Sequence, residues 1–169
     1  MAETVYILLG SNLGDREKNL DVARDRLSSI EGIEVIAVSS VYLSEAQQMK
    51  GENPTFLNQV VKADYSFSPY ELLRTLETIE QDMGRTGKGK REPRLIDLDI
   101  LLFGRETIES DHLTVPHREL LNRPFVLVPL LQIDPDLTHP VYNKPIAEYL
   151  SVDSRKQVLL FRDHVSRIV

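Results

Sequence analysis

Residues 93–104, PRLIDLDILLFG, contain two aspartates one residue apart inside an otherwise apolar run. A short apolar run that ends at a glycine predicts a buried strand. Side chains at positions i and i+2 of a strand point to the same face, so Asp97 and Asp99 project together, while the isoleucines and the leucine around them face the other side. Two adjacent carboxylates are costly when buried without partners, which favours a binding role for the pair.

The chain before this strand alternates between strand and helix patterns. Residues 3–10, 33–44 and 55–66 read as strands, and an apolar stripe predicts a helix over 16–32 that stops at Gly32. A second helix begins at Ser68-Pro69-Tyr70-Glu71, a capping-box pattern with proline at the first helical position, and ends at Gly84.

The resulting order of elements is β-α-β-β-α-β, which predicts a ferredoxin-like α+β fold with a mainly antiparallel sheet and two helices on one face. After Gly104 we expect a short hairpin, a helix near PFVLVPLLQI (124–133), a proline-rich connection and a last strand near QVLLF (157–161). His139 and His164 are expected at the surface. No repeat or linker divides the chain, so residues 1–169 are interpreted as a single domain.

Composition excludes several classes of protein. The chain has no cysteine, which rules out disulfides and thiolate metal sites. It has no apolar run near the roughly 20 residues that span a bilayer, and no signal-peptide pattern, so we expect a cytoplasmic protein without a membrane partner. The net charge of −6 argues against a nucleic-acid partner. A monomer is expected.

A basic segment precedes the aspartates. Residues 85–94, RTGKGKREPR, carry five positive side chains and one negative, a net charge of +4. This segment is either a solvated loop or an anion site. GRTGKGK (84–90) fits the first seven positions of a P-loop, but the eighth residue is Arg91 instead of Ser or Thr, and the segment follows a helix. We reject the P-loop; if the segment is an anion site, a Gly/Lys/Arg loop of this kind could close over polyphosphate.

The D-x-D pair becomes favourable if cations lie beside it. Mg²⁺ takes one or two carboxylates together with substrate phosphates and water, and two ions about 4 Å apart can assist a phosphoryl transfer. Alternatively, the acids lie on an exposed strand face or pair with Arg85 and Arg94. LTVPHREL (113–120) and NRPF (122–125) add further candidate polar residues downstream.

Five motifs occur in order across residues 10–125: GSNLGD, FLN, PRLIDLDILLFG, LTVPHREL and NRPF. In this combination the chain resembles the 6-hydroxymethyl-7,8-dihydropterin pyrophosphokinases of folate biosynthesis. The resemblance implies an ATP-dependent diphosphotransferase that moves pyrophosphate from ATP to the hydroxymethyl group of 6-hydroxymethyl-7,8-dihydropterin and releases AMP. It implies two Mg²⁺ ions as cofactors, with ATP and the pterin as the binding partners.

The resemblance also implies roles for individual residues. Both metal ions would be held by Asp97 and Asp99, and the catalytic set would add Arg85 and Arg94. The ATP-binding residues would include these two arginines and Ile100, His112, Thr114, His117, Arg118 and Arg123. The pterin-binding residues would be Ser44, Glu45, Gln47, Phe56, Asn58, Asp97 and Phe125, with the two phenylalanines stacking on the ring.

The chain departs from the family pattern at several positions. Arg91 stands where an aromatic residue is common, Glu45 follows Ser44 where proline is common, and Arg118 replaces a frequent tyrosine. Two other functions remain open: a two-metal phosphohydrolase or nucleotidyltransferase that uses the same aspartates, and a non-catalytic ferredoxin-like module that binds RNA. The acidic net charge and the lack of an aromatic-basic strand signature disfavour the module.

Overall fold

The computed structural model describes residues 2–44, 55–84, 95–162 and 166–167. Its main element is a seven-stranded sheet in which every described strand pair is antiparallel. The path runs β5-β1-β4-β2-β9, and β3 pairs with both β4 and β8. The strands are β1 (Glu3–Ser11), β2 (Ile33–Val38), β3 (Val41–Ser44), β4 (Phe56–Tyr65), β5 (Asp97–Phe103), β8 (Leu159–Arg162) and β9 (Ser166–Arg167).

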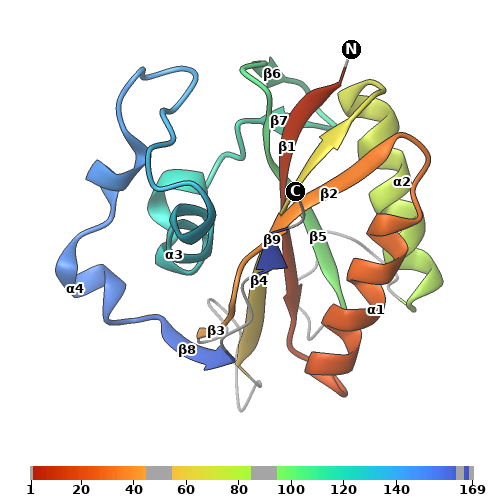
Figure 1. The fold of residues 1–169 in the computed structure, drawn as a ribbon, viewed down its shortest axis with the longest axis horizontal. Coiled ribbons are helices and arrows are strands. Elements are labelled where there is room, and N and C mark those ends of the chain that lie inside the picture. Colours follow the sequence, from red (N-terminus) through yellow and green to blue (C-terminus); the bar gives the residue numbers. More distant parts are fainter. Residues whose placement is uncertain (1, 45–54, 85–94, 163–165, 168–169) are drawn as a thin grey trace.

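Helices cover both faces of this sheet (Figure 1). On one face lie α1 (Arg16–Ser28) and α2 (Pro69–Asp82), and on the other lies α3 (Pro124–Ile133). The remaining elements are the hairpin of β6 (Ile108–Glu109) and β7 (Thr114–Val115), the short helix α4 (Val152–Arg155), and 3-10 helices over Leu120–Asn122 and Ile146–Tyr149. The predicted α+β class, the hairpin, the helix near 124–133 and the strand near 157–161 are confirmed, but β9 follows that strand, which is therefore not the last.

The predicted strand over 33–44 is instead two strands. The strand is interrupted at Ser39 and Ser40. The Ser39 hydroxyl donates a hydrogen bond to the Ser40 carbonyl at 2.8 Å and accepts one from the Val60 N–H at 2.9 Å. The Ser40 N–H donates to Oε1 of Gln132 at 2.8 Å, so α3 takes a hydrogen bond that a continuous strand would have used. Both β2 and β3 then pair with β4, along different parts of its length.

The predicted start of α2 is confirmed, whereas the predicted end of α1 is not. The capping box at Ser68 is present, with reciprocal bonds between Ser68 and Glu71, as predicted. The first helix, however, ends at Ser28, before the predicted stop. Gly32 lies in the turn into β2 with a φ of 84°, and a Cβ there would lie 2.6 Å from the Phe67 ring. The turn, therefore, requires glycine at this position for both reasons.

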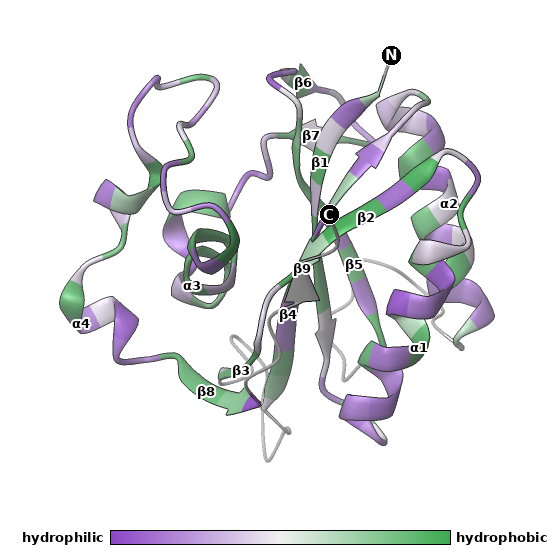
Figure 2. Cartoon of the chain, viewed as in Figure 1, coloured by the Kyte–Doolittle hydropathy of each residue, from purple (hydrophilic) through white to green (hydrophobic). Residues whose placement is uncertain are grey.

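Two hydrophobic cores sandwich the sheet. The first joins the sheet to α1 and α2, and the second joins it to α3. Strand β1 contributes Ile7 and Leu9 to the first core and Tyr6 and Leu8 to the second, which explains why it reads as a continuous apolar run. Figure 2 shows hydrophilic residues over the outer surface of α1 and apolar residues along β8. In the described part of the chain, no helix is long and apolar enough to cross a membrane.

The prediction that His139 lies at the surface is wrong. The side chain is 5% exposed and stacks on Tyr142, with 4.8 Å between ring centroids. Its Nδ1 accepts hydrogen bonds from the N–H groups of Val141 at 3.2 Å and Tyr142 at 3.4 Å. Burial lowers the pKa of His139 below its usual value, which favours the neutral ring that accepts these two hydrogen bonds. His164 lies outside the described residues.

Candidate active site

Asp97 and Asp99 lie on one face of β5, as the alternation predicts. Both are partly exposed, whereas Leu98 between them is 1% exposed and packs under α1 and α2 with its neighbours of the same face. In the register with β1, Asp97 stands opposite Gly10 and Asp99 opposite Leu8. Because Leu8 belongs to the core under α3, the two carboxylates occupy the α3 side of the sheet.

A row of residues continues from Asp97 across the sheet. Gly10 pairs with Asn58 of β4, and Asn58 pairs with Tyr42 of β3. A Cβ at Gly10 would touch Asn58 Oδ1 at 3.4 Å and the Phe56 ring at 3.5 Å. A single methyl group would fit at Gly10, but the Phe56 ring and the Asn58 amide leave no room there for a larger side chain.

Asn58 is held in a fixed orientation. Its side chain is 2% exposed, and Nδ2 donates a hydrogen bond of 2.6 Å to Oγ of Ser44, which is itself buried. Phe56 lies in the same strand and is partly exposed. The predicted pterin-binding residues Ser44, Phe56 and Asn58 are thus neighbours on adjacent strands β3 and β4.

Phe125 approaches the same region from the start of α3. It lines a cleft of about 510 Å³ together with Ser44, Thr55 and Pro124. The guanidinium carbon of Arg123 lies 5.7 Å from the centroid of the Phe125 ring, a cation–π distance. The predicted residues Arg123 and Phe125 therefore lie close together at the N-terminus of one helix.

A second cleft, of about 250 Å³, lies beyond Asp99. Six residues predicted for ATP or metal binding line it, which brings together parts of two motifs: Asp99, Ile100, His112, Thr114, His117 and Arg118. Leu73, Leu98 and Leu113 complete its walls. Leu73 was not identified from the sequence because it lies one residue beside the buried stripe of α2.

His117 is oriented by the backbone around it. Its N–H donates to the Leu101 carbonyl at 2.9 Å, which fastens the segment to β5. Its Nδ1 accepts from the Glu119 N–H at 3.1 Å, so the neutral ring carries its proton on Nε2. Arg118 donates to Oγ1 of Thr114 at 3.4 Å. In the neutral ring, Nε2 of His117 is therefore the nitrogen that donates a hydrogen bond.

A buried glutamate supports the D-x-D segment from behind. Glu80 of α2 is 2% exposed, and its Oε2 accepts a 2.8 Å hydrogen bond from the N–H of Leu98, the residue between the aspartates. Strand β5 lies at an edge of the described sheet, so an N–H that points away from β1, as that of Leu98 does, has no neighbouring strand to donate to. No sequence pattern indicated this contact, because a glutamate near a helix end ordinarily faces water.

Four predicted site residues lie outside the described residues: Arg85, Arg94, Glu45 and Gln47. Among the described residues, no group of three or more His, Asp or Glu side chains gathers in a geometry that could hold a metal ion. Of the residues predicted to hold a metal, both Asp97 and Asp99 lie within the described part of the chain.

The profile of the 7,8-dihydro-6-hydroxymethylpterin-pyrophosphokinase (HPPK) family matches residues 6–135. A relative from Aquifex aeolicus, named 2-amino-4-hydroxy-6-hydroxymethyldihydropteridine pyrophosphokinase, is 42% identical over 146 residues, 86% of this chain and 89% of the relative. The folic acid synthesis protein fol1 of Schizosaccharomyces pombe is 45% identical over 145 residues, 86% of this chain. The chain spans only 20% of that fungal protein.

Solved structures with the same arrangement include Plasmodium falciparum HPPK-DHPS wild type with pteroate. It matches with a TM-score of 0.71 at 16% identity, over 99% of this chain and 48% of that chain. A structure of HPPK-DHPS in complex with substrates matches with a TM-score of 0.69 at 15% identity, over 88% of this chain and 43% of that chain. At these identities the likeness shows the fold alone, and it confirms the ferredoxin-like arrangement.

Proposed function

The chain belongs to the 7,8-dihydro-6-hydroxymethylpterin-pyrophosphokinase family, and from this premise we propose that it transfers pyrophosphate from ATP to 6-hydroxymethyl-7,8-dihydropterin. The hydroxymethyl oxygen bonds to the β-phosphorus as the bond to the bridging oxygen of AMP breaks, a step in folate biosynthesis. One observation supports the proposal: each aspartate is connected to a different cleft. Asp99 lines one cleft, and Asp97 is in register with Gly10 and Asn58, whose hydrogen-bond partner Ser44 lines the other.

The side with Ser44, Phe56, Asn58 and Phe125 suits a flat heterocycle. Aromatic rings provide stacking surfaces, and a buried, pre-oriented amide recognises the hydrogen-bonding edge of a pterin. Asn58 keeps its orientation through Ser44, so little ordering entropy is lost when a ligand binds. We assign Glu45 and Gln47 to the same side from the family resemblance alone.

The cleft beyond Asp99 suits a nucleotide. Leu73, Ile100 and Leu113 offer an apolar wall for a purine, and His112, Thr114 and Arg118 add polar groups at its rim. We assign Nε2 of His117 to a phosphate oxygen of the nucleotide, because Nδ1 already accepts from the Glu119 N–H. Arginines suit phosphate because their charge persists at every physiological pH, and we assign Arg85, Arg94 and Arg123 to this task.

The aspartates fit Mg²⁺. Both are oxygen ligands on one strand face, both are partly exposed, and Mg²⁺ commonly uses one or two carboxylates with substrate phosphates and waters. When bound, two such ions would neutralise the ATP phosphates and favour ionisation of the hydroxymethyl group. The protein's own part is to hold both substrates in line, with Glu80 fixing the backbone between the two carboxylates. Action as a cytoplasmic monomer, and a single domain over residues 1–169, stay predictions.

Phosphorus NMR of the products tests this proposal against a two-metal hydrolase or nucleotidyltransferase. With ATP, Mg²⁺ and the pterin, we expect a pterin diphosphate and AMP to appear together in equal amounts. Inorganic phosphate with ADP would indicate a hydrolase, and free pyrophosphate with a nucleotidyl product would indicate a nucleotidyltransferase. RNA binding without any turnover would favour the non-catalytic module.

A further inference from the structure

The C-terminal segment 156–159 shares a cleft with two residues of the proposed pterin side. Lys156, Gln157, Val158 and Leu159 line the cleft of about 510 Å³ that Ser44 and Phe125 also line. None of the family motifs includes this segment, and the matched profile ends at residue 135. Residues 156–159 therefore line the proposed pterin side of the site in addition to the residues that the family motifs assign to it.

The segment is held on its C-terminal side by β8. Leu159 and Leu160 of β8 pair with Leu43 and Tyr42 of β3, beside the cleft (Figure 1). At the end of β8, Nη1 of Arg162 forms an ion pair of 2.8 Å with Glu17 of α1. These contacts keep residues 156–159 next to β3, so their placement does not depend on a bound ligand.

The register of the strands orients the segment toward the proposed substrate. Ser44 stands opposite Phe56, and Leu43 stands opposite Leu159. Continuing this antiparallel register by one residue brings Val158 level with Ser44. The row from Asp97 through Gly10 and Asn58 continues to Tyr42 and Leu160, and Ser44, which Asn58 hydrogen-bonds, lies two residues further along β3. A pterin with its hydroxymethyl group at Asp97 and its ring against Asn58 therefore directs its pyrimidine edge toward the cleft that Ser44 and residues 156–159 line.

We propose that Lys156 and Gln157 bind the pyrimidine edge of the pterin and contribute to the choice of substrate. This inference rests on the proposed function. The edge of a 2-amino-4-hydroxy pteridine presents an oxygen acceptor, ring nitrogens and an amino donor. The Lys156 ammonium donates to the oxygen, and the Gln157 amide both donates and accepts. Within the described residues, neither side chain has a hydrogen bond or ion pair, and both are exposed.

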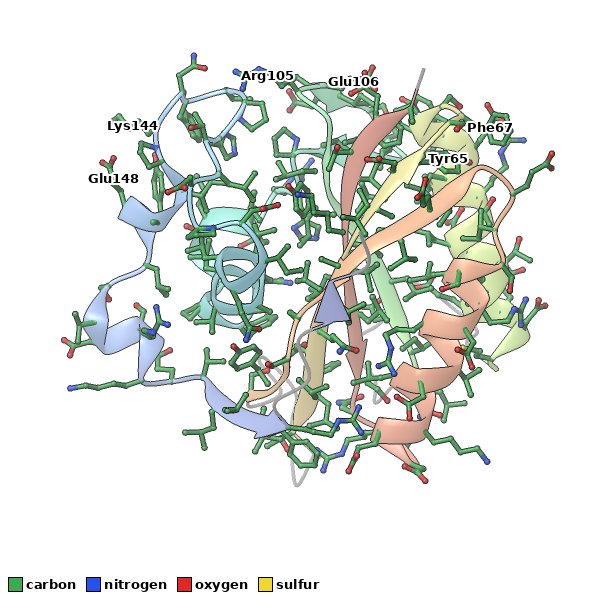
Figure 3. The ribbon with its side chains drawn as sticks, in the orientation of Figure 1. Tyr65, Phe67, Arg105, Glu106, Lys144 and Glu148 are labelled. Carbon is green, nitrogen blue, oxygen red and sulfur yellow. The ribbon has the colours of Figure 1, made fainter. Side chains whose placement is uncertain are left out.

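The test compares the wild-type chain with the double variant Lys156→Ala/Gln157→Ala. Calorimetry would give the dissociation constant of the pterin with a non-hydrolysable ATP analogue present, and the constant of that analogue alone. Loss of two hydrogen bonds should weaken pterin binding about fivefold to tenfold and leave nucleotide binding unchanged. Lys144→Ala/Glu148→Ala is the matched control, because it removes two exposed polar side chains from the far side of α3 (Figure 3).

A second ligand separates recognition from a merely structural effect. An analogue with an oxygen in place of the 2-amino group lacks a donor that Gln157 would recognise. The dissociation constants of the wild-type chain and the double variant should therefore differ less for this analogue than for the pterin. Unchanged pterin affinity in the double variant would overturn the inference. Equal weakening of pterin and nucleotide would also overturn it, because it would show a general effect on the fold. A wild-type chain that binds no pterin would refute the proposed function itself.

Discussion

Glu80→Ala probes the support behind the D-x-D pair. In the folded protein, Oε2 of Glu80 accepts from the Leu98 N–H at 2.8 Å, and both residues are nearly inaccessible to water, at 2% and 1% exposure. The alanine side chain is too short to accept this bond, and solvent has little access to the N–H that loses it. Because Leu98 separates the two aspartates, a shift of its backbone moves both carboxylates.

The size of the effect follows from this geometry. A buried donor that loses its acceptor costs about 1–3 kcal/mol, so Glu80→Ala should lower the free energy of unfolding by that amount. Under the proposed function, kcat should also fall about tenfold or more, since small displacements of positioned groups cost rate. Glu80→Gln keeps an amide oxygen as acceptor and should recover most of both losses.

Urea denaturation and steady-state kinetics give the two readouts. Glu77→Ala on the same helix is the control, because Glu77 is only half-buried and should change stability by less than about 0.5 kcal/mol. If Glu80→Ala matched Glu77→Ala in both stability and kcat, the Glu80–Leu98 bond would have no positioning role. A loss of stability with a normal kcat would show that the bond stabilises the fold but does not position the two aspartates.

Three further predictions concern other parts of the molecule. Gly10→Val should weaken pterin binding at least about tenfold in a calorimetric titration, because its side chain would meet the Phe56 ring; unchanged affinity would contradict the placement of the pterin. Tyr6→Phe should cost about 1 kcal/mol in urea denaturation, because its hydroxyl donates a hydrogen bond to Asp134. Burial, and then this bond, raise the pKa of Tyr6 and keep the hydroxyl protonated. Activity should not change, and a variant as stable as the wild type would show that the bond contributes nothing. Since burial lowers the pKa of His139 below 6.5, the folded state binds fewer protons than the unfolded state as the pH falls through that value, and stability is lost. The drop in melting temperature from pH 7.5 to pH 5.5 should therefore be smaller in His139→Asn, and an equal drop would exclude His139 as its cause.

Local patterns were sufficient for most of the fold. The helix expected over residues 124–133 is α3, and the capping box at Ser68 starts α2 as the sequence indicates. The alternation in PRLIDLDILLFG places the aspartates opposite the buried face of β5. In each case the deciding interactions lie within one element, so periodicity and capping chemistry report them directly.

The features that the sequence did not reveal depend on distant partners. The break between β2 and β3 involves Gln132, 92 residues after Ser40. Glu80 is buried because its partner is the backbone of an edge strand, which no helix pattern encodes. The wall formed by residues 156–159 arises from pairing between β8 and β3, which are far apart in the chain. Such contacts become visible only when the packing of the elements is known.

Pterin-dependent formation of AMP tests the central claim most directly, in the wild-type chain and in Asp97→Asn and Asp99→Asn. The wild-type chain should form AMP from ATP and Mg²⁺ only when 6-hydroxymethyl-7,8-dihydropterin is present. Each asparagine variant should lose about 10²-fold or more of that rate, with an unchanged fold by circular dichroism, and Asp25→Asn on α1 should keep it. AMP formed without pterin, or near-normal turnover in either variant at saturating Mg²⁺, would contradict the account.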